Sequence, residues 1–334
     1  MTDVRPPTLE EFRKAAEMIG PYVNLTPVQA WRGVRIADAA PPGAQVVVKL
    51  ELFQRAGAFK ARGAVLNLLR LDPYERARGV TAVSSGNHAV AVAYASQALG
   101  VDAKVVMLSS ANPARIAAAE SYGAQVVIGG DGAASFALGE RIALEEGRAF
   151  IHPFEGEGCT LGSGTLGLEF VAQTDGQLDA VIIPVGGGGL ASGAATAIRA
   201  LLPSCEIYGV EPTGADSMSR SFAAGTPVRL EKVSTIADSL APPMALPYSY
   251  AMCRRALTDI VTVSDQQIAQ AALLLFQEMK LAVEPAAAAA TAALVGPLRE
   301  RLAGKRVGLV VCGTNIDADG HARLMRLGRG ELAA

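Results

Sequence analysis

The chain has 334 residues, of which 50% are hydrophobic and 19% are charged, and its formal net charge is −2. This composition is typical of a folded globular protein, and the length predicts two lobes because single hydrophobic cores usually stop growing below this size. A nearly neutral chain without a run of Lys and Arg is poorly suited to nucleic acid or to an anionic membrane, so we expect neither as a partner.

The N-terminus and the cysteines bear on the compartment. The first fourteen residues, MTDVRPPTLEEFRK, contain no apolar signal segment, and no later apolar stretch resembles a membrane span. The 4 cysteines are widely spaced without a C-x-x-C pair, and the 3 histidines lack metal-ligand spacing. We therefore expect a cytoplasmic protein without a catalytic transition metal.

Short β-branched runs alternate with helical patterns along the chain. The predicted strands cover residues 46–50, 81–83, 104–108, 126–128, 149–152, 180–185, 207–210 and 307–311. Most are apolar on both faces, as strands of a covered parallel sheet are. A capping box at residues 264–267 predicts a helix over 268–279, and Pro285 opens an alanine-rich helix that Gly296 closes. The sequence therefore predicts an α/β protein with mainly parallel strands.

The first segment with chemical potential is Gly-Ala-Phe-Lys-Ala-Arg-Gly at residues 57–63, which follows the first predicted strand. Lys60 lies between small residues and Phe59 at a strand-to-helix turn. A Schiff-base lysine needs an amine that can be desolvated and room for a planar ring beside it. On this segment alone, a solvated lysine at a helix start is the simpler interpretation.

The second segment, Ser-Ser-Gly-Asn-His at residues 84–88, lies between a predicted strand and the helix over residues 89–99. Free backbone N–H groups at a helix start, together with two hydroxyls and an amide, could bind a substrate carboxylate. Ser and Asn are also ordinary helix caps, and His88 could be a buried structural histidine. The segment alone supports both interpretations.

The third segment contains four consecutive glycines, Gly186, Gly187, Gly188 and Gly189, between an apolar strand and the helix over residues 191–201. Exposed backbone amides at such a place favour a phosphate-binding loop. Residues 186–191 also match G-x-G-x-x-A, with Glu206 near the spacing of a ribose-binding acid. This match is weak, and it is the support for an NAD-dependent oxidoreductase as an alternative. A further G-x-G-x-x-G over 162–167 has no strand before it.

The fourth segment, Val-Cys-Gly-Thr-Asn at residues 311–315, ends the last predicted strand. Ligands of open α/β sheets bind at strand ends, so the Cys312 thiol could contact a cofactor ring. Cysteine is equally common as a buried residue without a role.

Together and in this order, these segments resemble the β-family (fold type II) of pyridoxal-phosphate enzymes, in its serine/threonine dehydratase and serine racemase branch. The likeness extends over nearly the whole chain, from Leu-Thr-Pro at 25–27 through Glu-Leu-Phe-Gln at 51–54 and Val-Glu-Pro at 283–285 to residues 312–317. It implies a tryptophan synthase β-like fold with two open, twisted, mainly parallel sheets and helices on both faces. The large pyridoxal-phosphate domain would comprise residues 1–72 and 157–334, and the small substrate domain residues 73–156.

The resemblance also assigns roles to individual residues. Lys60 would form the Schiff base with pyridoxal 5′-phosphate and act as the catalytic base, with Ser85 as a second catalytic group on the opposite face. Phe59, Asn87, Gly186, Gly187, Gly188, Gly189 and Cys312 would bind the cofactor. Ser84, Ser85, Asn87 and His88 would bind the substrate carboxylate.

The sequence also departs from this branch. Ala58 replaces the serine that usually precedes Phe-Lys, and Gly313-Thr314 replaces Gly-Gly. A divalent-cation site of racemase-like members would use Glu211 and Ala215, but Ser217 stands where a second carboxylate is expected, which argues against dependence on a cation.

The resemblance implies a dehydratase (ammonia-lyase) that converts L-threonine or L-serine, as β-hydroxy amino acids, to a 2-oxo acid and ammonia. A serine racemase and a 3-hydroxyaspartate dehydratase are the alternatives on the same scaffold. The absence of arginine from residues 132–139, where a second carboxylate would be bound, disfavours a dicarboxylic substrate. The family further suggests a homodimer.

Overall fold

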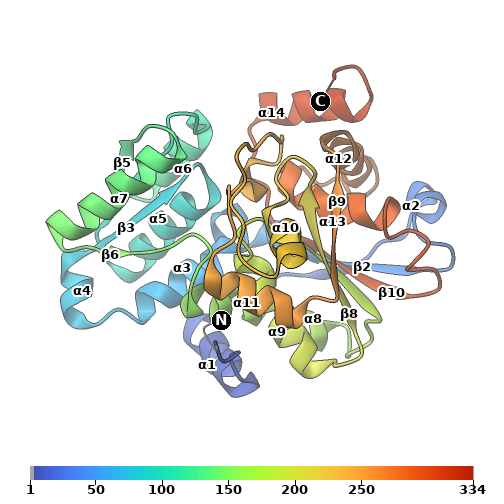
Figure 1. Ribbon diagram of the computed structural model, residues 1–334, viewed down its shortest axis with the longest axis horizontal. Coiled ribbons are helices and arrows are strands. Elements are labelled where there is room, and N and C mark those ends of the chain that lie inside the picture. The colour runs from blue at the N-terminus through green and yellow to red at the C-terminus, as the bar shows by residue number, and fades with distance from the viewer. Residues whose placement is uncertain (1–3, 334) are drawn as a thin grey trace.

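The computed structural model describes residues 4–333 and contains two open sheets, each in its own lobe (Figure 1). The large lobe contains six strands in the order β1 (Val28–Ala30), β2 (Gln45–Leu50), β10 (Arg306–Val311), β7 (Ala180–Pro184), β8 (Glu206–Pro212) and β9 (Asp259–Val263). The small lobe contains four strands in the order β5 (Gln125–Ile128), β4 (Ala103–Met107), β3 (Val80–Ser84) and β6 (Ala149–Phe150). Every strand pair is parallel except β1 with β2.

Helices surround both sheets, as the α/β prediction requires. They are α1 (Leu9–Ile19), α2 (Val34–Ala39), α3 (Lys60–Leu69), α4 (Pro73–Arg78), α5 (Asn87–Leu99), α6 (Pro113–Ser121), α7 (Gly132–Glu146), α8 (Glu157–Gln173), α9 (Gly189–Leu201), α10 (Ser217–Ala224), α11 (Pro247–Ala256), α12 (Asp265–Met279), α13 (Pro285–Val295) and α14 (Ala318–Gly328). Three short 3-10 helices are η1 (Glu51–Phe53), η2 (Arg55–Gly57) and η3 (Asp238–Leu240). Within residues 4–333, no helix is both long and apolar enough to cross a membrane.

The predicted helix signals work as expected. At the start of α12, the Gln267 N–H donates to the Ser264 hydroxyl at 3.2 Å, which completes the capping box. Pro285 begins α13, and Gly296 follows its last residue. Sequence analysis did not predict β1 or β9, the two edge strands of the large sheet. β1 has only three residues, and most of β9 is half-buried, so neither shows the apolar pattern of a covered strand.

The G-x-G-x-x-G match over residues 162–167 lies inside α8 and serves helix packing. A Cβ on Gly162 would lie 2.5 Å from the Gly63 Cα, so these two glycines allow α8 and α3 to approach closely. Glu206 is also committed elsewhere, because it forms an ion pair with Lys305 at 2.5 Å and accepts a hydrogen bond from Tyr208. Neither feature therefore supports a dinucleotide site.

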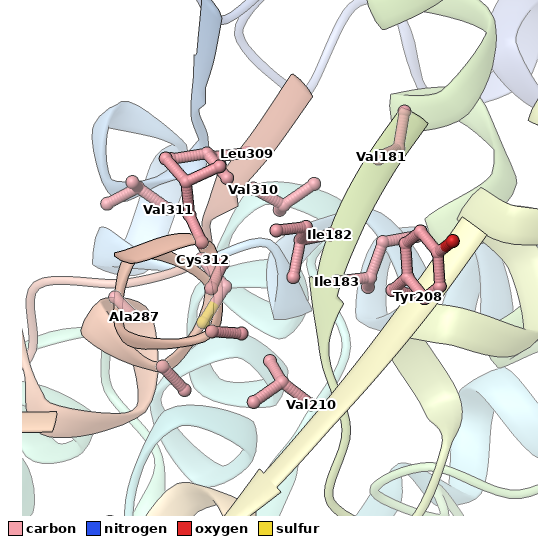
Figure 2. Close-up of a cluster of buried hydrophobic side chains, with 14 of the residues drawn as sticks. Val181, Ile182, Ile183, Tyr208, Val210, Ala287, Leu309, Val310, Val311 and Cys312 are labelled. Carbon is pink, nitrogen blue, oxygen red and sulfur yellow. The ribbon is translucent and has the colours of Figure 1, made fainter. Parts of the chain in front are cut away.

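The core of the large lobe lies around β10, β7 and β8 (Figure 2). Valine, isoleucine and leucine from the three strands pack together with Tyr208 and with Ala287 of α13, and Cys312 extends from the end of β10. Because these strands are parallel, the loops after β10, β7 and β8 emerge at one edge of the sheet. This edge positions Cys312, the glycine loop and Glu211.

Candidate active site

A cavity of about 230 Å³ is lined by residues of both lobes. Apart from the expected cation site, every cofactor-binding and substrate-binding residue predicted from the sequence lines it: Phe59, Lys60, Ser84, Ser85, Asn87, His88, Gly186, Gly187, Gly188, Gly189 and Cys312. The fold therefore brings together four segments that are spread along the chain between Phe59 and Cys312. Their individual roles remain predictions.

Lys60 begins α3 after a sharp change of chain direction. Ala56 and Gly57 have positive φ angles of 58° and 69°, which turn the chain from β2 into the helix. The Lys60 ammonium donates a hydrogen bond to the Pro153 carbonyl and lies 5.0 Å from the centre of the Phe59 ring. Burial lowers the pKa of Lys60 below its ordinary value, which increases the neutral fraction of its amine.

The four-glycine loop connects β7 to α9 and faces the cavity. Gly188 has a φ of 93°, a conformation that side-chain-bearing residues rarely adopt. A Cβ on Gly187 would lie 2.4 Å from the Phe154 ring, so only glycine fits between that ring and the loop. The first N–H groups of α9 lack acceptors within the helix, and they provide the donors that a phosphate group needs.

Residues 84–88 form the opposite, small-lobe side of the cavity. The Ser84 hydroxyl accepts the Gly86 N–H at 3.0 Å, and α5 begins immediately afterwards at Asn87. The His88 ring bonds to the Ile151 carbonyl at 2.8 Å, so Nε2 donates this hydrogen bond. Burial lowers the pKa of His88 to about 3, which favours the neutral ring. The expected contribution of His88 to carboxylate binding must therefore come from its backbone N–H at the helix start.

Cys312 lies beside the lysine segment. The Phe59 N–H donates to the Cys312 carbonyl at 3.1 Å, and Ala58 pairs with Gly313 in an isolated β-bridge. Burial raises the pKa of the Cys312 thiol well above its ordinary value, so the thiol is neutral. Ala58, which departs from the family pattern, thus pairs with Gly313, and Thr314, the other departure, donates its N–H to the Gly57 carbonyl at 2.9 Å. These contacts hold the lysine and cysteine segments together.

Sequence analysis did not assign roles to several other residues of the cavity. Glu284 is buried at the N-terminal end of α13, and its Oε1 accepts a hydrogen bond from Asn87 Nδ2 at 2.7 Å. Asp238 and Ser239 belong to η3, which covers the cavity from the large lobe. The Val-Glu-Pro motif identifies Glu284 as the residue before a helix start. Its hydrogen-bond partner Asn87 is 197 positions away in the sequence, so no local pattern predicts this contact.

The small lobe and the η3 region give the cavity an apolar wall. The wall contains Val83, Leu108, Phe136, Phe154, Leu240, Pro242 and Pro243. Phe136 belongs to an aromatic group in which its ring lies 5.9 Å from His152 and 6.3 Å from Phe150. Among the described residues that line the cavity, Lys60 is the only lysine or arginine.

The residues at the expected cation site do not fit a hard divalent ion. Both Glu211 oxygens accept N–H bonds from the start of α10, from Met218 at 2.9 Å and from Ser219 at 2.7 Å. The Ser217 hydroxyl is buried without a hydrogen-bond partner, so a neutral oxygen stands where a carboxylate would be needed. Ala215 adds no side-chain oxygen. A divalent cation requires several oxygen ligands including carboxylates, and these three residues offer one carboxylate that already accepts two N–H bonds.

The cavity does fit pyridoxal phosphate. The glycine loop forms a cradle that a single added Cβ would fill, Lys60 supplies an amine with a lowered pKa, and a neutral thiol stands at the end of β10. These features match the phosphate, the aldehyde and the ring of the cofactor, respectively.

Three comparisons with known proteins agree with this geometry. A protein family described as "Pyridoxal-phosphate dependent enzyme" matches residues 21–313. The chain is 55% identical to a phenylserine dehydratase of Ralstonia pickettii, over 98% of this chain and 100% of that protein, and 38% identical to an L-threo-3-hydroxyaspartate ammonia-lyase of Saccharomyces cerevisiae, over 96% of each. The structure of maize serine racemase superimposes with a TM-score of 0.90 at 32% identity, covering 98% of this chain and 99% of that one.

Proposed function

The chain belongs to the family of pyridoxal-phosphate-dependent enzymes, and we propose that it is an ammonia-lyase for β-hydroxy amino acids whose β-carbon bears an aromatic ring. The products would be a 2-oxo acid and ammonia. The prediction of a pyridoxal-phosphate-dependent lyase is confirmed by the phenylserine dehydratase and hydroxyaspartate ammonia-lyase relatives. The apolar wall of the cavity supports the aromatic side chain.

The wall discriminates among β-hydroxy substrates by its chemistry. Phe136, Leu108 and Phe154 provide apolar surface against which a phenyl ring can pack. A second carboxylate, as in 3-hydroxyaspartate, would be desolvated there without a cation other than Lys60, which the reaction itself uses. Threonine and serine would fit but would bury little of this surface. The relative named phenylserine dehydratase agrees with this preference.

The proposed roles follow from the site. Pyridoxal phosphate, when bound, withdraws electrons from the substrate Cα and so acidifies its proton. Lys60, with its lowered pKa, would accept that proton. The N–H groups at the start of α5 would bind the carboxylate with Ser84, Ser85 and Asn87, and residues 186–189 would bind phosphate. Since the Cys312 thiol is neutral, it cannot supply the negative charge that keeps a pyridine nitrogen protonated, which favours early loss of the β-hydroxyl over reprotonation of Cα.

Amino-acid racemisation is the second candidate activity. Ser85 lines the cavity together with Lys60, so a second proton donor is available within the same cavity. The similarity to maize serine racemase supports the same scaffold for this reaction.

Proton NMR in D₂O distinguishes these activities. The cofactor-loaded protein is incubated separately with L-threo-3-phenylserine, L-threonine, L-serine and L-threo-3-hydroxyaspartate. The proposal expects the fastest formation of 2-oxo acid from phenylserine, with little deuterium at Cα of the remaining substrate. Rapid Cα deuteration without 2-oxo acid would instead identify a racemase, and turnover confined to hydroxyaspartate would contradict the aromatic specificity.

The finer attributes predicted from the sequence also belong to this proposal. We propose a homodimer, because two large apolar side chains, Leu25 and Phe53, are 71% and 50% exposed. They lie near one another, since Asn24, the neighbour of Leu25, donates a hydrogen bond to the Phe53 carbonyl. A partner subunit could cover this apolar surface. Sedimentation equilibrium tests the homodimer.

We propose a cytoplasmic location, because the four cysteines are free thiols, which is typical of a reducing compartment. The two-sheet arrangement supports the proposed domain boundaries at residues 72/73 and 156/157.

A further inference from the structure

Arg115 connects the two lobes beside the cavity. It belongs to α6 of the small lobe, and its side chain is only 9% exposed. All polar contacts that the structure shows for this side chain reach the large lobe: Nε donates to the Asn315 carbonyl at 2.9 Å, the guanidinium bonds to the Asp238 carboxylate, and Nη2 lies 3.5 Å from Glu284 Oε2. A buried arginine that uses all three nitrogens across a lobe boundary is strongly constrained in position.

Glu284 lies between Arg115 and Asn87 and so links the arginine to the cofactor pocket. Its Oε1 accepts the bond from Asn87, whereas Oε2 has no hydrogen-bond partner among the described residues and lies 3.5 Å from Arg115 Nη2. The Asn87 amide is held at its other end by Asn315, whose Nδ2 donates to Asn87 Oδ1 at 2.8 Å. The Asn87 Nδ2 also donates to the Ser239 hydroxyl at 3.3 Å, so three large-lobe residues orient this amide. Arg115 contacts two of them, Glu284 and Asn315.

Two further contacts show that the start of α6 is fastened at this point. Asn112, the residue that caps α6, donates to Asp317 of the large lobe at 2.7 Å. Arg115 also lies against the carboxylate-binding loop, because a Cβ on Gly86 would be 2.7 Å from its Cδ atom. The arginine thus lies directly behind the substrate loop while it binds the opposite lobe.

We propose that Arg115 is a positioning residue that fastens the small lobe onto the large lobe and, through Glu284 and Asn315, orients the Asn87 amide for the cofactor. This role goes beyond the proposed ammonia-lyase activity and does not depend on which substrate is used. It depends on the protein binding pyridoxal phosphate. Without the guanidinium, Glu284 would be a buried carboxylate with one unpartnered oxygen, and it would either become protonated or move.

The charges that face Glu284 explain the expected pH response. Burial, with a smaller contribution from Asp238, raises the pKa of Glu284 to about 7, although Arg115, the Asn87 hydrogen bond and Lys60 favour its ionised form. The neutral groups beside it are the Asn87 amide and the Cys312 thiol. Loss of the Arg115 charge should therefore keep Glu284 protonated to higher pH.

The test compares Arg115→Ala and Arg115→Lys with Arg148→Ala. Arg148 is a matched control, because it is also largely buried, at 12% exposure, but its ion pairs with Asp102 and Glu146 lie within the small lobe. Three quantities are measured: the equilibrium affinity for pyridoxal phosphate, the pH titration of the cofactor absorption band, and amide hydrogen exchange of α5 and α6. The first two use purified protein titrated with pyridoxal phosphate, and the third uses the protein with and without it.

Arg115→Ala should weaken cofactor affinity by about 10- to 100-fold, since the loss of one hydrogen bond to a charged group has an effect of about this size. It should also move to higher pH the step of the absorption titration that follows the ionisation of Glu284, and it should accelerate exchange at residues 113–121. Arg115→Lys keeps the positive charge but cannot form the two-nitrogen contact with Asp238. Its cofactor affinity, titration and exchange rates should therefore lie between those of the unmodified protein and Arg115→Ala. Should Arg115→Ala match Arg148→Ala in all three measurements, Arg115 has no positioning role.

Asp238→Asn provides a second test that leaves the buried arginine in place. The Asp238 side chain is 46% exposed, so this variant should fold normally, yet it should show accelerated exchange in α6. In the double variant with Arg115→Ala, the exchange and affinity effects should be less than the sum of the single effects; full additivity would contradict the lobe connection. A protein without ammonia-lyase activity would refute the proposed function, while these binding and exchange measurements would still decide the role of Arg115.

Discussion

Phe136 offers the sharpest test of the aromatic specificity. It extends from α7 into the apolar wall, where its ring also contacts His152 and Phe150. An aromatic pair contributes about 0.5–1.5 kcal/mol beyond buried area. Loss of roughly 40 Å² of apolar contact in Phe136→Ala adds about 1 kcal/mol at roughly 25 cal/mol per Å². Phe136→Ala should therefore lower kcat/KM for phenylserine by about 10- to 70-fold, because 1.36 kcal/mol corresponds to a factor of ten.

The assay compares kcat/KM for phenylserine with that for threonine. Threonine lacks the ring, so Phe136→Ala should leave its kcat/KM nearly unchanged. Phe150→Leu is the control, because Phe150 packs against Phe136 but does not line the cavity. Phe136→Arg should place a cation in the wall and favour hydroxyaspartate over phenylserine by at least about tenfold relative to the unmodified protein. An equal loss for phenylserine and threonine in Phe136→Ala would refute the assignment of this wall to the substrate side chain.

Three further predictions concern the cofactor and the pH response. Lys60→Ala should abolish the borohydride-sensitive yellow absorption band while the protein stays folded by circular dichroism; a persistent band would assign the Schiff base to another amine. Gly187→Ala should weaken cofactor affinity by at least about tenfold, since its Cβ would clash with the Phe154 ring and displace N–H groups that would bind the charged phosphate, and unchanged affinity in a cofactor titration would argue against the phosphate loop. Burial raises the pKa of Glu211 to about 8, so its contribution to stability is complete below its ordinary pKa and is lost as the pH rises towards 8. In Glu211→Gln the decrease in Tm between pH 5 and pH 8.5 should therefore be smaller, and an unchanged decrease would show that Glu211 does not titrate in this interval.

The sequence was most informative where function depends on residues close together in the chain. Four glycines after an apolar strand, or a lysine at a strand-to-helix turn, are visible without a structure because the backbone geometry they need is local. Each of these segments remained ambiguous by itself. Their order along the chain identified the family, and the fold then brought them to one cavity.

The polar connection between the lobes could not be predicted in the same way. Arg115 and Asp238 are 123 positions apart, and Asn87 and Glu284 are 197 apart. An arginine in an amphipathic helix has the sequence pattern of a solvated surface residue, and only the packing of the lobes shows that it is buried. Phe136 could not be predicted as a substrate-contacting residue for a similar reason, since no sequence pattern near it shows that its face of α7 lies towards the cavity.

The two halves of the cavity use different parts of the chain, and this difference bears on specificity. The polar half offers backbone N–H groups at the starts of α5 and α9, and their positions depend on glycines and helix geometry more than on particular side chains. The other half is a surface of side chains, including Phe136 and Leu108, that can change without disturbing that backbone. Related enzymes can therefore share one cofactor and carboxylate site yet act on different β-substituents. Substitutions in the wall at α7 should accordingly alter the choice of substrate while the cofactor affinity stays the same.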